Sequence, residues 1–316
     1  MDQHYFLGDW GTTRLRLYRM AGEQIVDVRH GAGIGNVQLP VEVLRSLLEG
    51  WGNADRSIDA DAVTLCGMAS SRNGLLELSY AATPTDVESW ARSSRTIQIE
   101  TWQVLLATGV CCGNNDSGFD VMRGEEAQVF GAIRMHPALH DGRHLLVLPG
   151  THSKWVDVVD GSITHIRTSL TGELYALLCD HSTLLKASSN PGSNNSSEDI
   201  HDAGFIAGAH RAMIANESLL HAMFKTRTAQ LLQNRSADWA KGFLSGLLIG
   251  HEVAALMRET SPASVTLVGD PKITALYQRV FAMFAVMTDV LDGAACAIAG
   301  MQQLREVHHR LSRSVA

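Results

Sequence analysis

Two short segments of the sequence combine a glycine with hydroxyl residues in a way that could bind phosphate. The first reads GDWGTTRLRLY over residues 8–18, and the second reads LPGTHSKWV over residues 148–156. Leu15 and Leu17 alternate with arginines, which is the pattern of a strand with one buried face. A strand and not a helix is therefore expected after Gly11. Phosphate would therefore be bound by the amides and hydroxyls of a turn between two strands instead of by a helix N-terminus. The candidate phosphate contacts are Gly11, Thr12 and Thr13 in the first turn and Gly150, Thr151, His152 and Ser153 in the second.

The two turns belong to longer segments that repeat each other. Residues 4–30 read as three consecutive strands, and residues 144–169 show the same order of strand, tight turn, strand, turn and strand. Shifting the numbering by 139 places Gly11 on Gly150 and keeps strands of similar length around both. A repeat of this length favours two domains of like topology, whose turns could hold one nucleotide tail from both sides of a cleft. Taken singly, each turn could also be an ordinary hairpin.

Residues beside the two turns suggest how a polyphosphate and its metal would bind. Asp9 precedes the first turn, where the repeat has Leu148. A carboxylate beside a polyphosphate is unfavourable unless a cation lies between them, so we expect Asp9 to hold Mg²⁺, directly or through water. Lys154 could neutralise phosphate charge, although a solvated strand residue is an equal alternative. Gly269 ends the strand SVTLVG and could let an adenine ring lie against backbone, or it could be a simple turn between strand and helix.

Transfer of a phosphoryl group to an alcohol also needs an acceptor for the hydroxyl proton and contacts to the acceptor molecule. Glu125 and Glu126 begin a helix after a glycine, and one of them could face the cleft. The pattern alone favours surface glutamates that complement the helix dipole. Arg72 follows a strand in the segment GMASSRNG, and its planar guanidinium suits a substrate carboxylate, with Ser70 and Ser71 beside it. The alternative for Arg72 is an ordinary surface position in a loop.

The other segments predict alternating helices and strands. We expect helices over 40–54 and 121–135, a helix that begins at Thr171 and is capped there, and a strand followed by a helix over 264–284. Residues 186–203 are rich in serine and asparagine and predict a loop, which could act as a lid. Glycines at every fourth position, Gly242, Gly246 and Gly250, would let another backbone approach closely.

The bulk composition narrows the class of protein. The 316 residues are 45% hydrophobic and 19% charged, as in a soluble globular protein with one large domain or two modest ones. A net charge of −7 and the lack of any run of lysine and arginine argue against nucleic acid or anionic membranes as partners. No segment reads as a targeting or membrane-spanning sequence, so we expect a cytoplasmic protein. The five cysteines lack CxxC spacing and are expected to be reduced.

Taken together, the motifs resemble one known family. GDWGTTRLRLY, GMASSRNG, DVMRGEEAQVFGA, LPGTHSKWV, TSLTGELYALL and FLSGLLIGHEVA occur in the order found in 2-dehydro-3-deoxygalactonokinases, within the sugar kinase, actin and heat-shock ATPase superfamily. The resemblance covers nearly the whole chain. It implies an α/β fold of two ribonuclease-H-like (actin-like ATPase) domains, each with a mixed sheet, around a central nucleotide cleft. The implied domains are residues 1–138 and 139–292, with a C-terminal helix over 293–312 that packs back on the first domain.

The resemblance also implies an activity. ATP with Mg²⁺ would phosphorylate 2-dehydro-3-deoxy-D-galactonate at its 6-hydroxyl in galactonate catabolism. The GEEA segment is similar to one in exopolyphosphatases of the superfamily, where the glutamate before the alanine acts on the attacking water. This likeness makes Glu126 the first candidate for the proton acceptor and Glu125 the second. A homodimer is one possible assembly, and the sequence does not decide the number of chains.

Two positions depart from the family pattern, and other functions stay open. Asp270 follows Gly269 where a small or hydroxyl residue is expected, which bears on adenine specificity. Leu75 follows Gly74 where the family usually has an aromatic residue, so the sugar acid could differ. The alternatives are a phosphohydrolase of the same superfamily, a kinase of another sugar acid, and a sugar or nucleotide sensor without catalysis.

Overall fold

The computed structural model describes residues 4–51, 58–114, 118–185, 197–214 and 217–315. The chain forms two compact units. The first unit contains Met1–Leu146, Val156–Arg167 and Leu291–Ala316, and the second contains Val147–Trp155 and Thr168–Val290. The domain boundaries expected at residues 138 and 292 stay a prediction.

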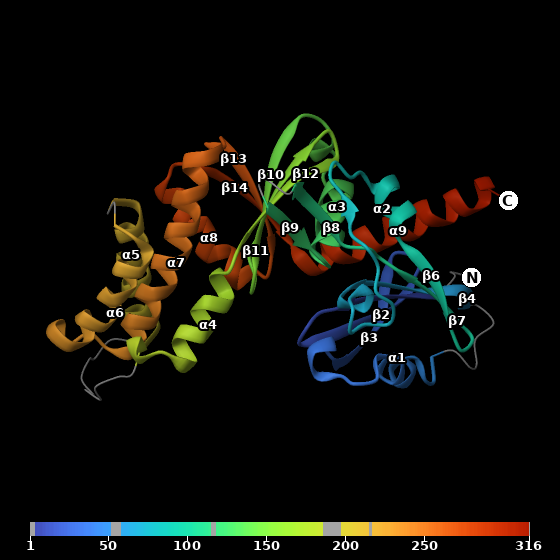
Figure 1. Ribbon diagram of the computed structural model, residues 1–316, viewed down its shortest axis with the longest axis horizontal. Coiled ribbons are helices and arrows are strands. Elements are labelled where there is room, and N and C mark those ends of the chain that lie inside the picture. Colours follow the sequence, from blue (N-terminus) through green and yellow to red (C-terminus); the bar gives the residue numbers. More distant parts are fainter. Residues whose placement is uncertain (1–3, 52–57, 115–117, 186–196, 215–216, 316) are drawn as a thin grey trace. The chain divides into compact units, whose positions relative to one another are not determined.

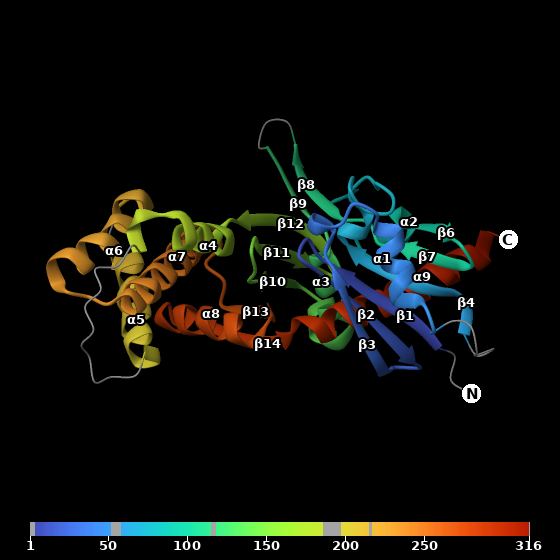
Figure 2. The ribbon, with the colours of Figure 1, turned by 90° about the horizontal axis from the view of Figure 1, so that it is seen from below.

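The first unit is built on a six-stranded mixed sheet that begins with the expected meander. Strands β1 (His4–Trp10), β2 (Arg14–Ala21) and β3 (Gln24–Ala32) lie side by side (Figure 2). The sheet continues through β4 (Ile58–Gly67), β7 (Trp102–Leu106) and β6 (Arg95–Ile99) in the order β3-β2-β1-β4-β7-β6. Since β1 is antiparallel to β2 and parallel to β4, the prediction of a mixed sheet is confirmed for this unit.

The alternation in β2 determines which face of this sheet is buried. Leu15 and Leu17 have no exposed surface, and they pack in one core with Phe6 and Trp10. The ring of Phe6 stacks on Trp51 at 5.3 Å. Burying each such side chain stabilises the fold by roughly 1.5–3 kcal/mol. This core fixes the register of β1 and with it the position of the residues at its carboxyl end.

A second, three-stranded sheet in this unit was not predicted. It contains β5 (Ala81–Ala82), β8 (Val110–Asn114) and β9 (Gly118–Met122) in the order β5-β8-β9. The expectation of a helix over 121–135 is therefore wrong at its start, because the last residues of β9 pair with β8. Helix α3 begins at Glu125 and ends at Met135, after Gly124 with its positive φ of 113°. A glycine accepts this conformation easily, so the chain can change direction there.

The C-terminal helix α9 (Gly293–Val315) packs along α3 within the first unit. A Cβ atom added to Gly131 would lie 1.7 Å from the Cys296 carbonyl oxygen, and one on Gly300 would lie 1.9 Å from that of Ala127. Only glycine at these positions lets the two backbones touch. The Arg134 guanidinium also makes two hydrogen bonds with the Glu306 carboxylate, at 2.8 and 2.9 Å. Helix α9 thus holds the helix that carries both candidate glutamates.

The remaining short elements of the first unit connect these parts. Helix α1 spans Pro40–Leu48 and is shorter than the predicted 40–54, while α2 spans Val87–Ser93. Residues 52–54 of the predicted helix lie outside the described residues. Short 3₁₀ segments occur at Ile34–Asn36, Met68–Ser70 and Pro137–His140.

The second meander is also confirmed. Strands β10 (Arg143–Leu148), β11 (Ser153–Val159) and β12 (Ser162–Ser169) form one end of a five-stranded sheet of order β12-β11-β10-β13-β14. The other members are β13 (Ser264–Gly269) and β14 (Met287–Asp292). The order β12-β11-β10 matches the order β3-β2-β1 of the first sheet, as the repeat in the sequence predicts.

Figure 1 shows the helices of the second unit, two of which pack against each other through glycines. The helices are α4 (Thr171–His181), α5 (Ser197–Ile214), α6 (Leu219–Gln233), α7 (Ala237–Thr260) and α8 (Pro271–Met283), with a 3₁₀ turn at Thr183–Leu185. A Cβ on Gly242 or Gly246 of α7 would lie 2.0 Å from a carbonyl oxygen of α5. Gly204 and Gly208 of α5 face α7 in the same way. The close approach predicted from the glycine spacing is confirmed.

The start of α5 and the N-cap of α4 differ from what the sequence predicts. Residues 197–203, predicted as part of a loop, begin α5, and the backbone of His201 in this segment lies against Gly242 of α7. Residues 186–196 of that predicted loop lie outside the described residues. Helix α4 begins at Thr171 as expected, but Leu170 is the N-cap and no side chain caps it. The Thr171 hydroxyl donates instead to Glu252.

Candidate active site

In the first unit, two parallel strand ends and a helix N-terminus come together. Asp9 pairs with Cys66 and Trp10 pairs with Gly67 where β1 and β4 end. A Cβ on Gly124 would lie 3.1 Å from the Gly67 Cα atom, so the start of α3 lies against these strand ends. The candidate metal ligand and the two candidate glutamates therefore occupy one region of one unit.

Asp9 lies in a desolvated environment. Burial raises the pKa of the Asp9 carboxyl, while the nearby Arg16 and Arg14 lower it. Burial raises the pKa of the neighbouring Cys66 thiol well above its usual value, and the charges of Asp9 and Glu126 raise it further. The Cys66 side chain is therefore a neutral thiol at physiological pH.

Glu126 is fully buried, and one of its carboxylate oxygens is unpaired. Its Oε2 atom accepts a hydrogen bond of 2.7 Å from the Gly124 amide, whereas Oε1 has no hydrogen-bond partner among the described residues. Burial and then the charge of Glu125 raise the pKa of Glu126 to about 8. The surface position favoured by the helix pattern is therefore wrong for Glu126. A buried carboxyl with a raised pKa and a free oxygen is suited to receive a proton.

Glu125 lies differently. It is partly exposed, and its Oε2 atom accepts a hydrogen bond of 3.1 Å from the Arg123 amide. This contact ties the carboxylate to the residue before the N-cap Gly124, and a negative charge in the first helical turn also complements the helix dipole. The structure thus separates two adjacent glutamates that the sequence could not separate.

We predict that the charge of Glu126 makes the stability of the protein depend on pH. Because its folded pKa of about 8 lies above the ordinary 4.5, the folded state retains a proton that the unfolded state loses. The free energy of unfolding should therefore fall as pH rises from about 4.5 to about 8. Glu126→Gln should be less sensitive over this window. Denaturant unfolding of both proteins at several pH values measures the difference, and parallel curves would contradict the assignment.

Arg123 organises this region and was missed in the sequence. Its Nη1 atom donates to the backbone oxygen of Ser70 at 2.7 Å and to the Ser70 hydroxyl at 2.6 Å. Its Nη2 atom donates to the Leu78 carbonyl at 3.0 Å, and its guanidinium stacks 4.2 Å from the centre of the Tyr80 ring. Arg123, the residue before Gly124, therefore ties the loop after β4 to the start of α3. The only signal in the sequence was an arginine next to the GEEA segment.

The three candidate substrate residues after β4 differ in exposure. Ser70 is buried, and its hydroxyl donates to the Ala107 carbonyl at 2.6 Å. The Ser71 hydroxyl donates to the Met68 carbonyl at 2.7 Å. The Arg72 side chain is 84% exposed, and its Nε atom lies 3.7 Å from a Glu77 carboxylate oxygen. Of the three, Arg72 has the side chain that is most accessible to a ligand.

The first glycine-threonine turn has a fixed backbone and exposed hydroxyls. The Gly11 amide donates to the Arg14 carbonyl at 2.9 Å, and the Thr12 carbonyl accepts from the Gly35 amide at 2.9 Å. The side chains of Thr12 and Thr13 are exposed. The turn therefore presents two hydroxyls on a backbone that neighbouring segments hold in place.

The second turn is in contact with the first residues of helix α4. The Glu173 amide donates to the Thr151 carbonyl at 2.9 Å, and the Glu173 carboxylate accepts from the His152 ring nitrogen Nε2 at 2.5 Å. A Cβ on Gly172 would lie 2.3 Å from the Gly150 carbonyl oxygen. The start of α4 therefore contacts the turn directly, and only glycine fits at this point.

Lys154 and Ser153 are buried, in contrast to the exposed residues of the turn. Lys154 is 6% exposed, and its Nζ atom donates to the Thr168 hydroxyl at 2.8 Å. The alternative of a solvated strand residue is therefore wrong for Lys154. Ser153 has no exposed surface, and its hydroxyl lies 3.2 Å from that of Tyr277. The side chain of Ser153 thus points into the unit, and its backbone remains the part that could reach phosphate.

Gly269 lies next to the second turn, and the departure at Asp270 has a structural cause. A Cβ on Gly269 would lie 3.6 Å from the carbonyl oxygen of Pro149, the residue before Gly150. Asp270 is the N-cap of α8, and its Oδ1 atom accepts from the Lys272 amide at 2.8 Å. Aspartate caps helices as well as serine or threonine does. Asp270 therefore caps α8 as a serine or threonine at this position would.

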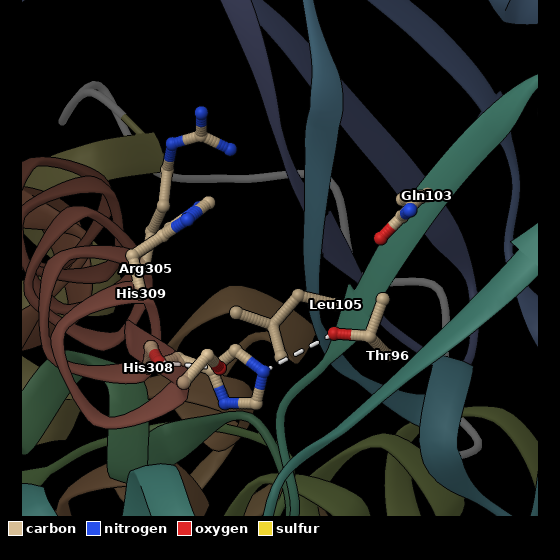
Figure 3. Close-up of a pocket in the computed structure, with 7 residues that line it drawn as sticks. Thr96, Gln103, Leu105, Arg305, His308 and His309 are labelled. Atoms are coloured by element: carbon tan, nitrogen blue, oxygen red, sulfur yellow. Dashed lines mark hydrogen bonds between the residues drawn. The ribbon is translucent and has the colours of Figure 1, made fainter. Parts of the chain in front are cut away.

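The two turns belong to different units, so their approach across a cleft stays a prediction. A cavity of about 300 Å³ occurs elsewhere in the first unit, between α9 and the strands β6 and β7. Figure 3 shows His308 on its wall, with a hydrogen bond of 3.2 Å to Thr96. None of the candidate site residues lines this cavity.

Three further observations concern metals, thiols and membranes. The described residues contain no group of three or more histidines, cysteines and acids that could hold a metal ion. A single carboxylate is nevertheless enough for Mg²⁺, which usually retains waters and is shared with substrate phosphates, so Asp9 fits that metal. All five cysteines are free, as predicted. None of the helices in the described segments is long and apolar enough to cross a membrane.

Comparison with known proteins agrees with this architecture. A 2-dehydro-3-deoxygalactonokinase of Escherichia coli (strain K12) is 31% identical over 308 residues, covering 96% of this chain and 98% of that protein. A crystal structure from Sinorhizobium meliloti, described as a candidate 2-dehydro-3-deoxygalactonokinase, superimposes with a TM-score of 0.78 at 27% identity. It covers 96% of this chain and 98% of its own.

The duplicated meander, with a glycine-threonine turn in each copy and an acid at one strand end, defines an α/β fold that the chain shares with this candidate sugar-acid kinase. Among proteins of this fold the match is specific. The family model of the 2-keto-3-deoxy-galactonokinases matches residues 9–304, and the chain belongs to that family.

Proposed function

We propose that the protein transfers the γ-phosphoryl group of ATP to the 6-hydroxyl of 2-dehydro-3-deoxy-D-galactonate, as a step of galactonate catabolism. The observation that carries this proposal is the buried Glu126, with its unpaired oxygen and raised pKa, in the same region of the first unit as Asp9, in a chain of this family. The two relatives described above carry the name of this activity.

The two turns and Asp9 would bind the nucleotide and its metal. The hydroxyls of Thr12 and Thr13 and the backbone of residues 150–153 would contact phosphate oxygens. Gly269 would lie against the adenosine. Asp9 would hold Mg²⁺, directly or through water, and the metal when bound would neutralise charge on the phosphates. Positioning and charge neutralisation are the main sources of rate in such transfers.

Glu126 would accept the proton of the sugar hydroxyl. A base is most useful when its pKa lies near the working pH, and the value of about 8 meets this condition. Arg72 would bind the carboxylate of the sugar acid, with Ser71 beside it. Ser70 would contribute by holding Arg123, which positions the loop relative to α3. Glu125 is the second candidate for the proton acceptor.

Activity measurements with purified protein test this proposal. ATP and Mg²⁺ are incubated with 2-dehydro-3-deoxygalactonate, its gluconate epimer and other keto-deoxy sugar acids, while ADP release and the phosphorylated product are followed. Acid-dependent ADP release with a 6-phosphorylated product supports the proposal. Steady ADP release without acid dependence would indicate a phosphohydrolase. Binding of ATP or a sugar acid without turnover would indicate a sensor. A cytoplasmic location and a homodimer stay predictions.

We predict that Lys154→Ala weakens ATP binding specifically. The ammonium group is the buried cation beside the second turn, and its loss should raise the KM for ATP by roughly tenfold, with little change in the KM for the sugar acid. Steady-state kinetics with each substrate varied in turn measure the two constants. Lys241→Ala on the exposed side of α7 is the matched control. An unchanged KM for ATP in Lys154→Ala would contradict the assignment.

A further inference from the structure

A buried carboxylate beneath the second turn connects four elements of the second unit. Glu252 on α7 is 7% exposed. Its Oε1 atom accepts from the indole nitrogen of Trp155 on β11 at 2.6 Å. Its Oε2 atom accepts from the hydroxyl of Tyr277 on α8 at 2.6 Å and from the hydroxyl of Thr171 at the start of α4. A buried charge is tolerated when donors surround it in this way.

The donors and acceptors of the hydrogen bonds from Glu252 through Tyr277 to Ser153 are fixed by the carboxylate, which can only accept. The Tyr277 hydroxyl has one proton, and the short bond to the carboxylate uses it. The contact of 3.2 Å between Tyr277 and Ser153 must then use the serine proton. Burial and the charge of Glu252 raise the pKa of Tyr277 well above its usual value, so the phenol stays protonated. The Ser153 hydroxyl is thereby oriented inward, away from any ligand of the turn.

Glu252 also fixes the part of α4 that contacts the turn. It binds Thr171, and the next two residues make the direct contacts to residues 150–152. The Gly172 backbone packs on the Gly150 carbonyl, and the Glu173 amide donates to the Thr151 carbonyl at 2.9 Å. The turn is thus held at Ser153 through Tyr277 and at Gly150 and Thr151 through α4.

We propose that Glu252 is a positioning residue that sets the geometry of the second turn for the phosphates of ATP, through Tyr277 and Ser153 on one side and Thr171 on the other. This inference rests on the proposed function, because it assumes that the second turn binds ATP. Glu252 itself would not contact the nucleotide.

The variant Glu252→Gln tests the direction of the network at constant size. Trp155 can only donate, so the glutamine oxygen must face it, and the amide nitrogen must face the two hydroxyls. Those hydroxyls then accept, and the Tyr277 proton turns toward Ser153. The dissociation constant of MgATP, measured by calorimetry, and its KM should both rise by roughly tenfold, with the KM for the sugar acid within about twofold. Tyr277→Phe should raise the same two constants for MgATP by a smaller factor.

The controls separate a positioning role from a structural one. Glu259→Gln, at an exposed position on the same helix, should leave all constants unchanged. Equal loss of affinity for both substrates together with a lower Tm would show a merely structural role and overturn the proposal. If Glu252→Gln does not fold, Thr171→Val and Tyr277→Phe decide by the same criterion.

Comparison with Lys154→Ala distinguishes the possible failures. If Lys154→Ala weakens MgATP binding and Glu252→Gln does not, the positioning role is wrong and the proposed function stands. If Lys154→Ala leaves MgATP binding unchanged and Glu252→Gln weakens it, only the assignment of Lys154 is wrong. If neither variant changes MgATP binding, the second turn is not a phosphate site, and the role of Glu252 fails with it.

Discussion

Replacing Glu126 with glutamine should lower kcat by roughly 10²–10⁴-fold and leave the protein folded, since this is the range that a positioned general base contributes. Glutamine has nearly the same shape and can still accept the hydrogen bond from the Gly124 amide, but it cannot receive a proton. Because Glu126 is buried with one unpaired oxygen, the neutral side chain should not destabilise the fold. Steady-state kinetics and thermal unfolding of the same preparation measure both quantities.

Glu125→Gln is the matched control for this experiment. Glu125 is the adjacent residue, and its partly exposed carboxylate accepts from the Arg123 amide at the start of the helix. Its replacement should change kcat by only a fewfold and lower stability slightly, by about 0.3–1 kcal/mol, through the lost interaction with the helix dipole. A large loss in Glu125→Gln with a near-normal rate in Glu126→Gln would exchange the roles of the two residues. Near-normal rates in both would show that the proton acceptor lies elsewhere.

The second large effect is expected for Asp9→Asn. The amide has no negative charge to hold Mg²⁺, so kcat should fall by roughly 100-fold or more, and the Mg²⁺ concentration needed for half-maximal rate should rise. Since burial already raises the pKa of Asp9, a neutral side chain at this position should cost the fold little. Rates measured over a Mg²⁺ titration for the wild type and the variant provide the test.

Asp160→Asn serves as the control for Asp9→Asn. Asp160 is an exposed aspartate in the turn between β11 and β12, with a φ of 49° that asparagine also adopts. Its Oδ1 atom accepts from the Gly142 amide at 2.8 Å, and an asparagine oxygen can do the same. The control should retain normal rates and normal Mg²⁺ dependence. If Asp9→Asn behaves like this control, Asp9 does not hold the metal.

Strand alternation and glycine spacing predicted much of the fold. The β1-β2-β3 and β10-β11-β12 meanders follow from local sequence, because alternation and turn residues lie within a few positions of each other. The glycines of α7 predicted a close backbone contact, although not its partner α5. The β8-β9 hairpin was missed because its pairing partner and the short β5 are specified by tertiary contacts and not by a local pattern.

The candidate site was predictable in residue type but not in environment. The sequence identified Glu126 as a candidate, yet helical periodicity alone placed it on the surface, because it does not show that the start of α3 lies against the ends of β1 and β4. Arg123 and Glu252 were missed for a related reason. Each is a single charged residue whose partners lie far away in the sequence, so nothing near it in the chain indicates the bonds it makes.

The contact between α3 and α9 has a consequence for synthesis of the protein. The helix bearing Glu126 is translated early, whereas the helix that it packs against, Gly293–Val315, leaves the ribosome much later. A nascent polypeptide interrupted before those residues lacks the support for the helix that carries Glu126, the proposed proton acceptor. Unfinished chains should therefore be inert toward ATP and sugar, so that phosphorylation begins only with completed molecules.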